Sequence, residues 1–214
     1  MALLEIRGLS LGFAGNRVLQ NVSFAVEQGT IASLIGPNGA GKTSLFNCIT
    51  GFYKPQDGSI VFNGTETRRL RPWQVTRAGI ARTFQNVRLF RQMTVIENVM
   101  SGQHCRTSAG AIAAVLRLPS QRREEARIRE VAASCLAFVD IRPDEWERDA
   151  TTLAYGHQRR VEIARALATE PKLLLLDEPA AGLTKSEKAD LVTLISRIRA
   201  ERGVTVLLIE HDTG

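Results

Sequence analysis

The sequence predicts an α/β fold with a mixed sheet core, an antiparallel β subdomain and a helical subdomain. The apolar runs at residues 173–176 and 204–209 are typical of parallel strands buried on both faces. Apolar residues between these runs recur at the spacing of one face of an amphipathic helix, so a right-handed strand, helix, strand crossover is expected. No strand pattern of any length is present from about residue 87 to 167, which predicts a block of helices.

The remaining elements follow in chain order. Short β-like runs separated by turns precede a helix that is expected to begin at Lys42 and to end near Gly51. The predicted strands of this part are residues 3–6, 22–26, 30–35 and, after a turn, 59–62. The helical patterns of the middle block are residues 94–104, 121–139 and 156–168.

Composition indicates one domain without a membrane span of its own. With 214 residues, of which 44% are hydrophobic, the chain can bury one substantial core. Its apolar runs fall far short of the roughly 20 residues of a transmembrane helix. Residues 1–7 lack the pattern of a secretory signal. The 3 cysteines form no CxxC pair, so neither a disulfide framework nor a zinc site is expected. These features predict a cytosolic protein.

The charge of the chain does not select one class of partner. A net charge of +6 and a pI near 9.7 suit nucleic acid, anionic lipid headgroups or a polyphosphate ligand. The basic residues occur in short groups, and one of them, Arg122 and Arg123, lies among acidic residues such as Glu124 and Glu125. This mixture favours solvated helix faces.

A glycine-rich segment between the strand at residues 30–35 and the helix from Lys42 matches the phosphate-binding pattern GxxxxGK[ST]. Its glycines allow a bend whose backbone N–H groups point inward, and the dipole of the helix adds positive potential. Lys42 is expected to reach the β- and γ-phosphates, and the Thr43 hydroxyl to bind Mg²⁺. The residues predicted to bind a nucleoside triphosphate here are Gly36, Pro37, Asn38, Gly39, Ala40, Gly41, Lys42, Thr43 and Ser44.

An acidic pair follows the apolar run at residues 173–176. Asp177 is expected to support Mg²⁺, directly or through water, and Glu178 to polarise the water that attacks the γ-phosphate. The alternative is an exposed acidic turn before Pro179. The predicted helical block lies between this pair and the glycine-rich segment.

At this point the sequence resembles the ABC ATPase family over essentially the whole chain. Leu153-Ala154-Tyr155-Gly156-His157 and the following helix are similar to the family's LSGGQ signature. The resemblance implies a P-loop NTPase fold of the ABC type, with residues 1–86 and 168–214 as the nucleotide-binding core and about 87–167 as the helical subdomain. It also implies that Ala154, Tyr155, Gly156 and His157 contact ATP held by a partner subunit, so that two subunits enclose two nucleotides. Gly156 lets the backbone approach an anion closely.

Three further residues resemble functional residues of the family. Gln85, in Thr83-Phe84-Gln85, resembles the Q-loop glutamine, which contacts Mg²⁺ or the water and links the site to the membrane subunit. His211 resembles the switch histidine, which contacts the γ-phosphate and positions the water. Phe13 resembles the aromatic residue that stacks on adenine, although a core position is an alternative for it.

The sequence departs from the family pattern in three places. Ala154 and Tyr155 replace Ser and Gly of the signature, and His157 replaces its Gln. The change from Ser to Ala154 removes one hydroxyl that could bind the γ-phosphate. Thr184 stands where the D-loop often has Asp. The chain ends 3 residues after His211, where relatives continue, so it resembles a shortened chain. Hydrolysis is still expected, because the predicted catalytic residues are unaffected.

Within the family, residues 81–99, 153–156 and 177–183 resemble the ATP-binding subunits of bacterial branched-chain amino acid importers. This implies transmembrane permease subunits, a second ABC ATPase subunit in a homodimer or heterodimer, and indirectly a periplasmic binding protein. It also implies a peripheral position at the cytoplasmic face of the inner membrane, and no nucleic acid partner is expected.

Three alternatives stay open. Urea and short-chain amide importers have nearly the same ATPase subunit. Soluble ABC ATPases of DNA repair or translation use the same motifs, and the basic pI is compatible with them, but they usually carry long coiled coils or two ATPase domains. An ATP-binding scaffold without catalysis is disfavoured because both Glu178 and His211 are present.

Overall fold

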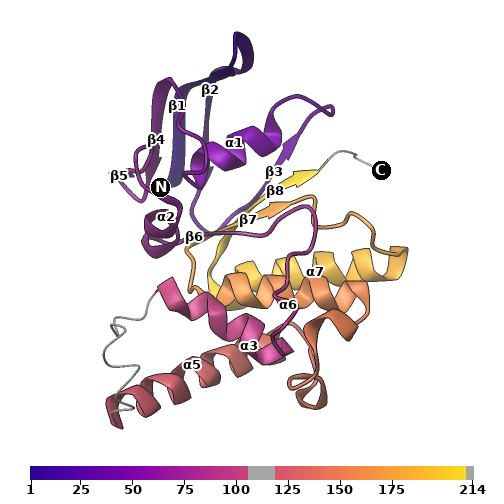
Figure 1. Ribbon diagram of the computed structural model, residues 1–214. Coiled ribbons are helices and arrows are strands. Elements are labelled where there is room, and N and C mark those ends of the chain that lie inside the picture. The colour runs from indigo at the N-terminus through magenta and orange to yellow at the C-terminus, as the bar shows by residue number, and fades with distance from the viewer. Residues whose placement is uncertain (106–118, 211–214) are drawn as a thin grey trace. The chain divides into compact units, whose positions relative to one another are not determined.

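The computed structural model describes residues 1–105 and 119–210, which form two compact units (Figure 1). Unit 1 comprises Met1–Gln85 and Pro171–Gly214, and unit 2 comprises Asn86–Glu170. His211 lies outside the described residues. Within the described ranges, no helix combines the length and the apolar character that a bilayer crossing requires.

Unit 1 contains an antiparallel sheet in the strand order β2-β1-β4-β5. Ala14 and Gly15 have positive φ, 46° and 88°, and form the tight turn between its first two strands. Turns of this left-handed type match the twist of antiparallel strands. The strands are β1 (Ala2–Phe13), β2 (Asn16–Glu27), β4 (Asp57–Phe62) and β5 (Thr65–Glu66).

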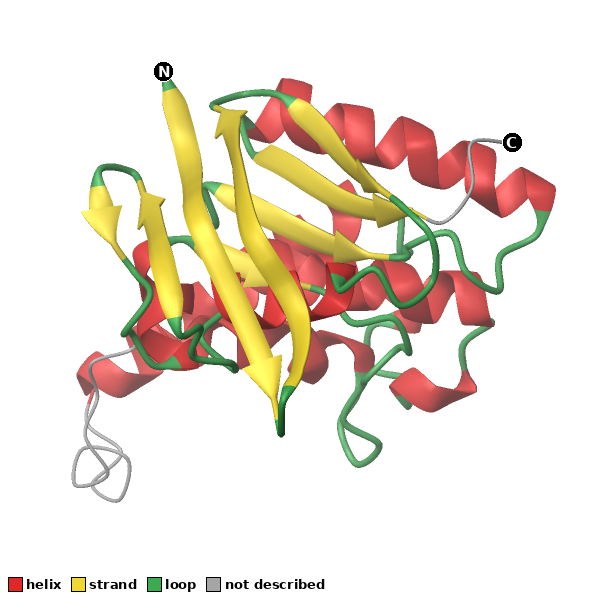
Figure 2. Ribbon diagram, turned by 90° about the horizontal axis from the view of Figure 1, so that it is seen from above, coloured by secondary structure: helices red, strands yellow, loops and turns green. Residues whose placement is uncertain are grey.

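A second, parallel sheet of unit 1 has the order β3-β8-β7-β6 and confirms the predicted α/β class (Figure 2). Its strands are β3 (Ile31–Ile35), β6 (Ile80–Arg82), β7 (Leu173–Asp177) and β8 (Thr205–Glu210). The helices of unit 1 are α1 (Lys42–Ile49), α2 (Pro72–Ala78) and α7 (Lys185–Arg202). Since all four strands run in one direction, their carboxyl ends meet at one edge, where open α/β sheets bind ligands.

The core of unit 1 joins the two sheets through α1. Its buried cluster combines side chains of β1, β4, β7 and β8 with Leu45, Phe46, Cys48 and Ile49 of the helix. Burial raises the pKa of the Cys48 thiol to about 11, so the side chain stays a neutral thiol at neutral pH. The helix that opens at the glycine-rich segment is therefore fixed by apolar packing along its length.

Unit 2 is helical, as the absence of strand patterns predicted. Its helices are α3 (Val95–Met100), α5 (Pro119–Phe138) and α6 (Tyr155–Ala168), with 3-10 helices at Ser101–Cys105, Pro143–Glu145 and Ala150–Thr152. The predicted helix at residues 94–104 is α-helical only to Met100. At Gly102 an added Cβ would come within 2.4 Å of the Arg165 carbonyl oxygen, so this segment runs close to the backbone of α6.

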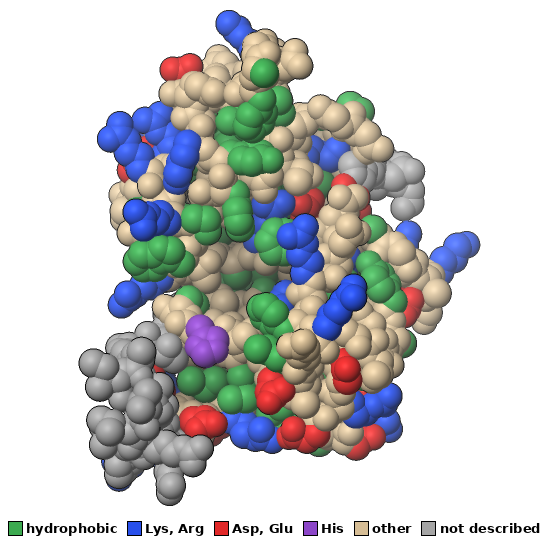
Figure 3. Space-filling view, in the orientation of Figure 1, with side chains coloured by type: hydrophobic (Ala, Val, Ile, Leu, Met, Phe, Trp, Pro, Cys, Tyr) green, Lys and Arg blue, Asp and Glu red, His purple; other side chains and the backbone are tan. Residues whose placement is uncertain are grey.

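Acidic and basic side chains are intermingled on the visible surface of unit 2 (Figure 3). Exposed ion pairs join Arg129 to Glu147 and Arg142 to Asp144. Pairs of this kind contribute little to stability, at most about 1 kcal/mol. The visible face of this unit is thus of mixed charge.

Asn98 of α3 is a fully buried polar residue whose side chain fixes the preceding loop. Its Nδ2 donates to the carbonyl oxygens of Phe90, Met93 and Thr94 at 3.1, 3.2 and 3.0 Å. Its Oδ1 accepts from the Phe90 N–H at 2.8 Å. The amide side chain satisfies four backbone groups of the loop at once.

Replacing Asn98 with Leu is expected to lower the free energy of unfolding by about 2–4 kcal/mol, because buried backbone groups lose their partners. Chemical denaturation measures the change. The matched control is Arg91→Ala on the exposed side of the same loop, expected to shift stability by less than about 0.5 kcal/mol. Equal effects of the two substitutions would contradict the role given to Asn98.

Candidate active site

The glycine-rich segment lies between β3 and α1, at the carboxyl end of its strand. Gly41 is the residue that precedes α1 and has a φ of 86°. A Cβ there would lie 2.8 Å from both the Val18 carbonyl oxygen and the Leu19 Cδ2, so only glycine fits. No side chain caps α1 at this residue, and the N–H groups of its first turn can therefore serve an anion.

The Lys42 side chain is folded onto this segment. The residue is 7% exposed, and its ammonium group donates to the carbonyl oxygens of Gly36 and, at 2.9 Å, of Pro37. Thr43, next in the chain, is exposed at the start of α1, and Ser44 is partly buried. A cation and a hydroxyl thus accompany the helix N-terminus in the part of unit 1 where phosphates were predicted to bind.

The acidic pair lies at the end of β7. Asp177 is 1% and Glu178 8% exposed, so the alternative of an exposed acidic turn is not what the structure has. The Glu178 N–H donates to the Ile209 carbonyl oxygen of β8 at 3.1 Å. The backbone of Glu178 has a φ of 48°, in the left-handed region. This conformation costs a non-glycine residue about 1–3 kcal/mol and often marks an active site.

Gln85 and Glu178, two of the predicted catalytic residues, are in contact. The Gln85 Nε2 donates to the Glu178 Oε2 at 2.9 Å. The two residues are far apart in sequence, and each follows a strand of the parallel sheet, β6 for Gln85 and β7 for Glu178. The third predicted catalytic residue, His211, follows β8 and lies outside the described residues.

The Asp177 carboxylate has two unlike oxygen atoms. Its Oδ2 accepts a hydrogen bond and ion pair from the Arg82 Nη2 at 2.6 Å, whereas its buried Oδ1 has no hydrogen-bond partner. A buried carboxylate oxygen without a partner is uncommon. Since Mg²⁺ prefers oxygen ligands, this atom and the exposed Thr43 hydroxyl fit the predicted metal.

Phe13 is half-exposed at the end of β1. Its side chain is in edge-to-face contact with Tyr53, with ring centroids 5.1 Å apart, and 46% of the residue is exposed. The core alternative is thus wrong, because nearly half of the residue is exposed. Tyr53, which supports it, was not predicted from the sequence.

The signature segment lies in unit 2 at the start of α6. The residue before the helix is Ala154, whose side chain makes no capping hydrogen bond, and Tyr155 is 41% exposed. Gln158 stabilises the segment, because its Nε2 donates to the Leu153 carbonyl oxygen at 2.8 Å and to that of Thr151 at 3.2 Å. The uncapped first turn can accept an anion.

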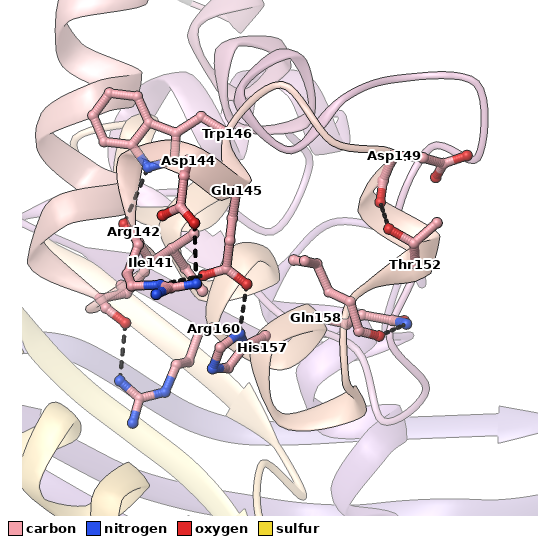
Figure 4. Close-up of polar contacts among 12 residues, drawn as sticks. Ile141, Arg142, Asp144, Glu145, Trp146, Asp149, Thr152, His157, Gln158 and Arg160 are labelled. Atoms are coloured by element: carbon pink, nitrogen blue, oxygen red, sulfur yellow. Dashed lines mark hydrogen bonds and ion pairs between the residues drawn. The ribbon is translucent and has the colours of Figure 1, made fainter.

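His157, which replaces the family's glutamine, points toward the 3-10 helix Pro143–Glu145 (Figure 4). Its Nδ1 lies 3.2 Å from the Glu145 Oε1, and Glu145 is buried. Arg160, which lies on α6 like His157, donates to the Val139 carbonyl oxygen at 2.9 Å. These contacts attach the first turns of α6 to the segment that follows α5.

Buried charges continue along α6. Arg159 and Glu162 form an ion pair of 2.8 Å and are each 1% exposed. Burial lowers the pKa of Arg165, while the nearby Glu162 carboxylate opposes this change. At the segment before α6, a hydrogen bond from the Thr151 hydroxyl lowers the pKa of Asp149. The helix that carries the signature is held by packing and by internal ion pairs.

The D-loop departure at Thr184 has a structural explanation. Thr184 precedes α7, its hydroxyl accepts from the Glu187 N–H at 3.3 Å, and the Glu187 carboxylate accepts from the Thr184 N–H at 2.8 Å. This reciprocal capping box starts the helix. Threonine is thus used here as a helix cap.

A phosphate-binding loop that opens a helix at the carboxyl edge of a parallel sheet defines the P-loop class of nucleotide-binding proteins. Known proteins place the chain within this class. A family model described as "ABC transporter" matches residues 19–181, so the chain belongs to the ABC transporter family. It is an ATPase of that family and binds ATP.

Relatives cover nearly the whole chain. The high-affinity branched-chain amino acid transport ATP-binding protein BraF of Pseudomonas aeruginosa is 48% identical over 98% of this chain and 82% of its own length. The protein of the same description from Escherichia coli, LivG, is 46% identical over the same shares. Among solved structures, the ADP conformation of MJ1267, an ATP-binding cassette of an ABC transporter, is 32% identical, with a TM-score of 0.85 over 100% of this chain and 83% of that one.

Proposed function

We propose that this chain is the ATP-binding and hydrolysing subunit of an ABC importer that powers the uptake of branched-chain amino acids. The observation that carries the proposal is the identity of 46–48% over 98% of the chain to ATP-binding proteins of high-affinity branched-chain amino acid transport. That the chain is an ATPase follows from its membership of the ABC transporter family. The transported solute is proposed.

We infer the roles of the described site residues from their positions, and those of His211 and Phe13 from the family resemblance. The glycine-rich loop and Lys42 hold the β- and γ-phosphates, which the uncapped first turn of α1 attracts. Thr43, Gln85 and Asp177 would hold Mg²⁺, which would neutralise phosphate charge when bound. The Glu178 carboxylate, oriented by the Gln85 amide, takes up a proton from the attacking water. His211 contacts the γ-phosphate, and Phe13 stacks on adenine.

ATP is enclosed by two subunits in this proposal. The first turn of α6, with Ala154, Tyr155, Gly156 and His157, would meet the γ-phosphate of ATP held by a second ABC ATPase subunit. Support comes from the missing side-chain cap before α6 and from the exposed Tyr155. Hydrolysis then removes the phosphate that joins the subunits, and they separate.

The remaining partners are proposed from the same relatives. Transmembrane permease subunits would receive the motion through the residues after Gln85, and a periplasmic binding protein would deliver the solute to them. The chain would sit peripherally at the cytoplasmic face of the inner membrane. A urea or short-chain amide importer is the second candidate, and a soluble ABC ATPase acting on nucleic acid or ribosomes is the third.

Reconstitution with the permease subunits and the binding protein from the same genome is expected to give leucine-stimulated ATP hydrolysis and leucine accumulation in proteoliposomes. The control is the same preparation without the binding protein, which should hydrolyse ATP at a rate that leucine does not change. Stimulation by urea or acetamide in place of leucine would assign the second candidate. Salt-sensitive binding to DNA or RNA without membrane partners would assign the third.

A further inference from the structure

Arg82, the last residue of β6, has a buried side chain that contacts two other elements of unit 1. Its side chain is 5% exposed, and its Nη2 donates to the Asp177 Oδ2 at the end of β7, at 2.6 Å. Its Nη1 donates to the Asn47 Oδ1 of α1, also at 2.6 Å. One guanidinium group thus joins the helix of the phosphate loop to the strand of the acidic pair.

Asn47 stands one helical turn after Thr43, so the two residues share a face of α1. Through Asn47, the Arg82 side chain is held against the face that carries the predicted Mg²⁺ hydroxyl. The spacing gives Arg82 a fixed position relative to Thr43 as well as to Asp177. Arg82 is therefore held in place relative to both Asp177 and Thr43, two of the residues assigned to Mg²⁺.

Two aromatic rings lie close to the guanidinium group of Arg82. The Cζ of Arg82 lies 5.5 Å from the ring centroid of Phe46 and 5.2 Å from that of Phe84. Both distances fall within the range of a cation–π contact. Planar arginine suits such a position, whereas lysine offers a point charge without the two-armed geometry.

We propose that Arg82 is a positioning residue for Mg²⁺ binding: by engaging Asn47 and the Asp177 Oδ2, it turns the unpartnered Oδ1 toward the metal. The inference rests on the proposed assignment of Asp177 to the metal. In this proposal Arg82 acts through Asp177 and does not itself bind the nucleotide or the metal. Substitution of a group that orients a metal-binding residue typically lowers metal affinity by about 10- to 100-fold.

The test separates metal-dependent from metal-independent nucleotide binding. A fluorescent ADP analogue is titrated into wild-type protein and Arg82→Met, once with Mg²⁺ and once with EDTA. For each protein, the dissociation constant in EDTA is divided by that in Mg²⁺. This ratio is expected to be about 10- to 100-fold lower in the variant than in wild-type protein. Affinity in EDTA is expected to change less than about twofold, because the phosphate loop is intact. Mn²⁺, followed by its electron paramagnetic resonance signal, reports metal binding directly.

Two milder variants keep the test informative if Arg82→Met folds poorly. Arg82→Lys retains the charge and is expected to restore part of the ratio, and Asn47→Ala releases one arm of Arg82 and should lower the ratio less than Arg82→Met does. Arg129→Met, at an exposed position of α5 in unit 2, is the control and is expected to keep the wild-type ratio. The inference is overturned if the variants lose affinity for the ADP analogue equally in EDTA and in Mg²⁺. It is also overturned if folded variants keep the wild-type ratio. If wild-type protein shows no metal dependence at all, the assignment of Asp177 to the metal fails instead.

Discussion

Glu178→Gln is expected to lower the rate of ATP hydrolysis by about 10²–10⁴-fold, the usual contribution of a general base. The carboxylate accepts from the Gln85 Nε2 at 2.9 Å, and the amide oxygen of glutamine can accept the same hydrogen bond. The fold and the affinity for ATP should therefore be retained. Because the γ-phosphate stays uncleaved, ATP-bound dimers should accumulate, and gel filtration with light scattering in the presence of ATP and Mg²⁺ measures them.

The chain offers a closely matched control for this substitution. Glu170 also has a left-handed backbone, with a φ of 51°, and it also accepts from a glutamine amide, the Gln103 Nε2 at 3.3 Å. Glu170→Gln thus makes the same chemical change at another left-handed residue with a glutamine partner, at an exposed position outside the predicted site. Turnover should stay near the wild-type value in that variant. An unchanged rate in Glu178→Gln, or an equal loss in both variants, would refute the assignment.

The sequence predicted β7 and β8 because burial on both faces leaves a continuous apolar run. All of β7 is buried, so its limits were close to those of the pattern. It was also possible to predict the loop at Lys42, since the motif combines a strand, glycines and a helix start. Here local pattern and tertiary environment agree.

Other elements could not be predicted because they are short or irregular. The strand β6 has 3 residues, and α2 has 7, too few for a periodic signal. The long strands β1 and β2 were predicted only as residues 3–6 and 22–26. Register shifts interrupt their pairing at several points, so their side chains do not alternate regularly between buried and exposed.

Contacts distant in sequence explain what was missed in the site. Arg82 and Asp177 are 95 positions apart, and no spacing rule connects them. Arg82 was visible as the residue before Thr83-Phe84-Gln85, but only the pairing of β6 beside β7 brings it to the acidic pair. Motifs identified the groups assigned to ATP, whereas the supporting residues depend on the tertiary fold.

Lys42→Ala is expected to weaken ATP binding by about 10- to 150-fold, the effect of losing one or more charge-assisted hydrogen bonds to phosphate. In the structure its ammonium donates to the Gly36 and Pro37 carbonyl oxygens of the loop, so it is already placed where a triphosphate would bind. Isothermal titration calorimetry with ATP and Mg²⁺ measures the change. Hydrolysis at subsaturating ATP should fall in parallel.

Lys54→Ala is the matched control for this loss. The Lys54 ammonium likewise donates to backbone carbonyl oxygens of unit 1, those of Leu70 and Arg68, but it is exposed and stands outside the phosphate loop. If Lys42 served only to tie carbonyl groups of the chain together, its loss would affect stability and leave the affinity for ATP unchanged. A loss of ATP affinity in a folded Lys42→Ala protein, with the affinity unchanged in Lys54→Ala, therefore supports a phosphate bound at the loop.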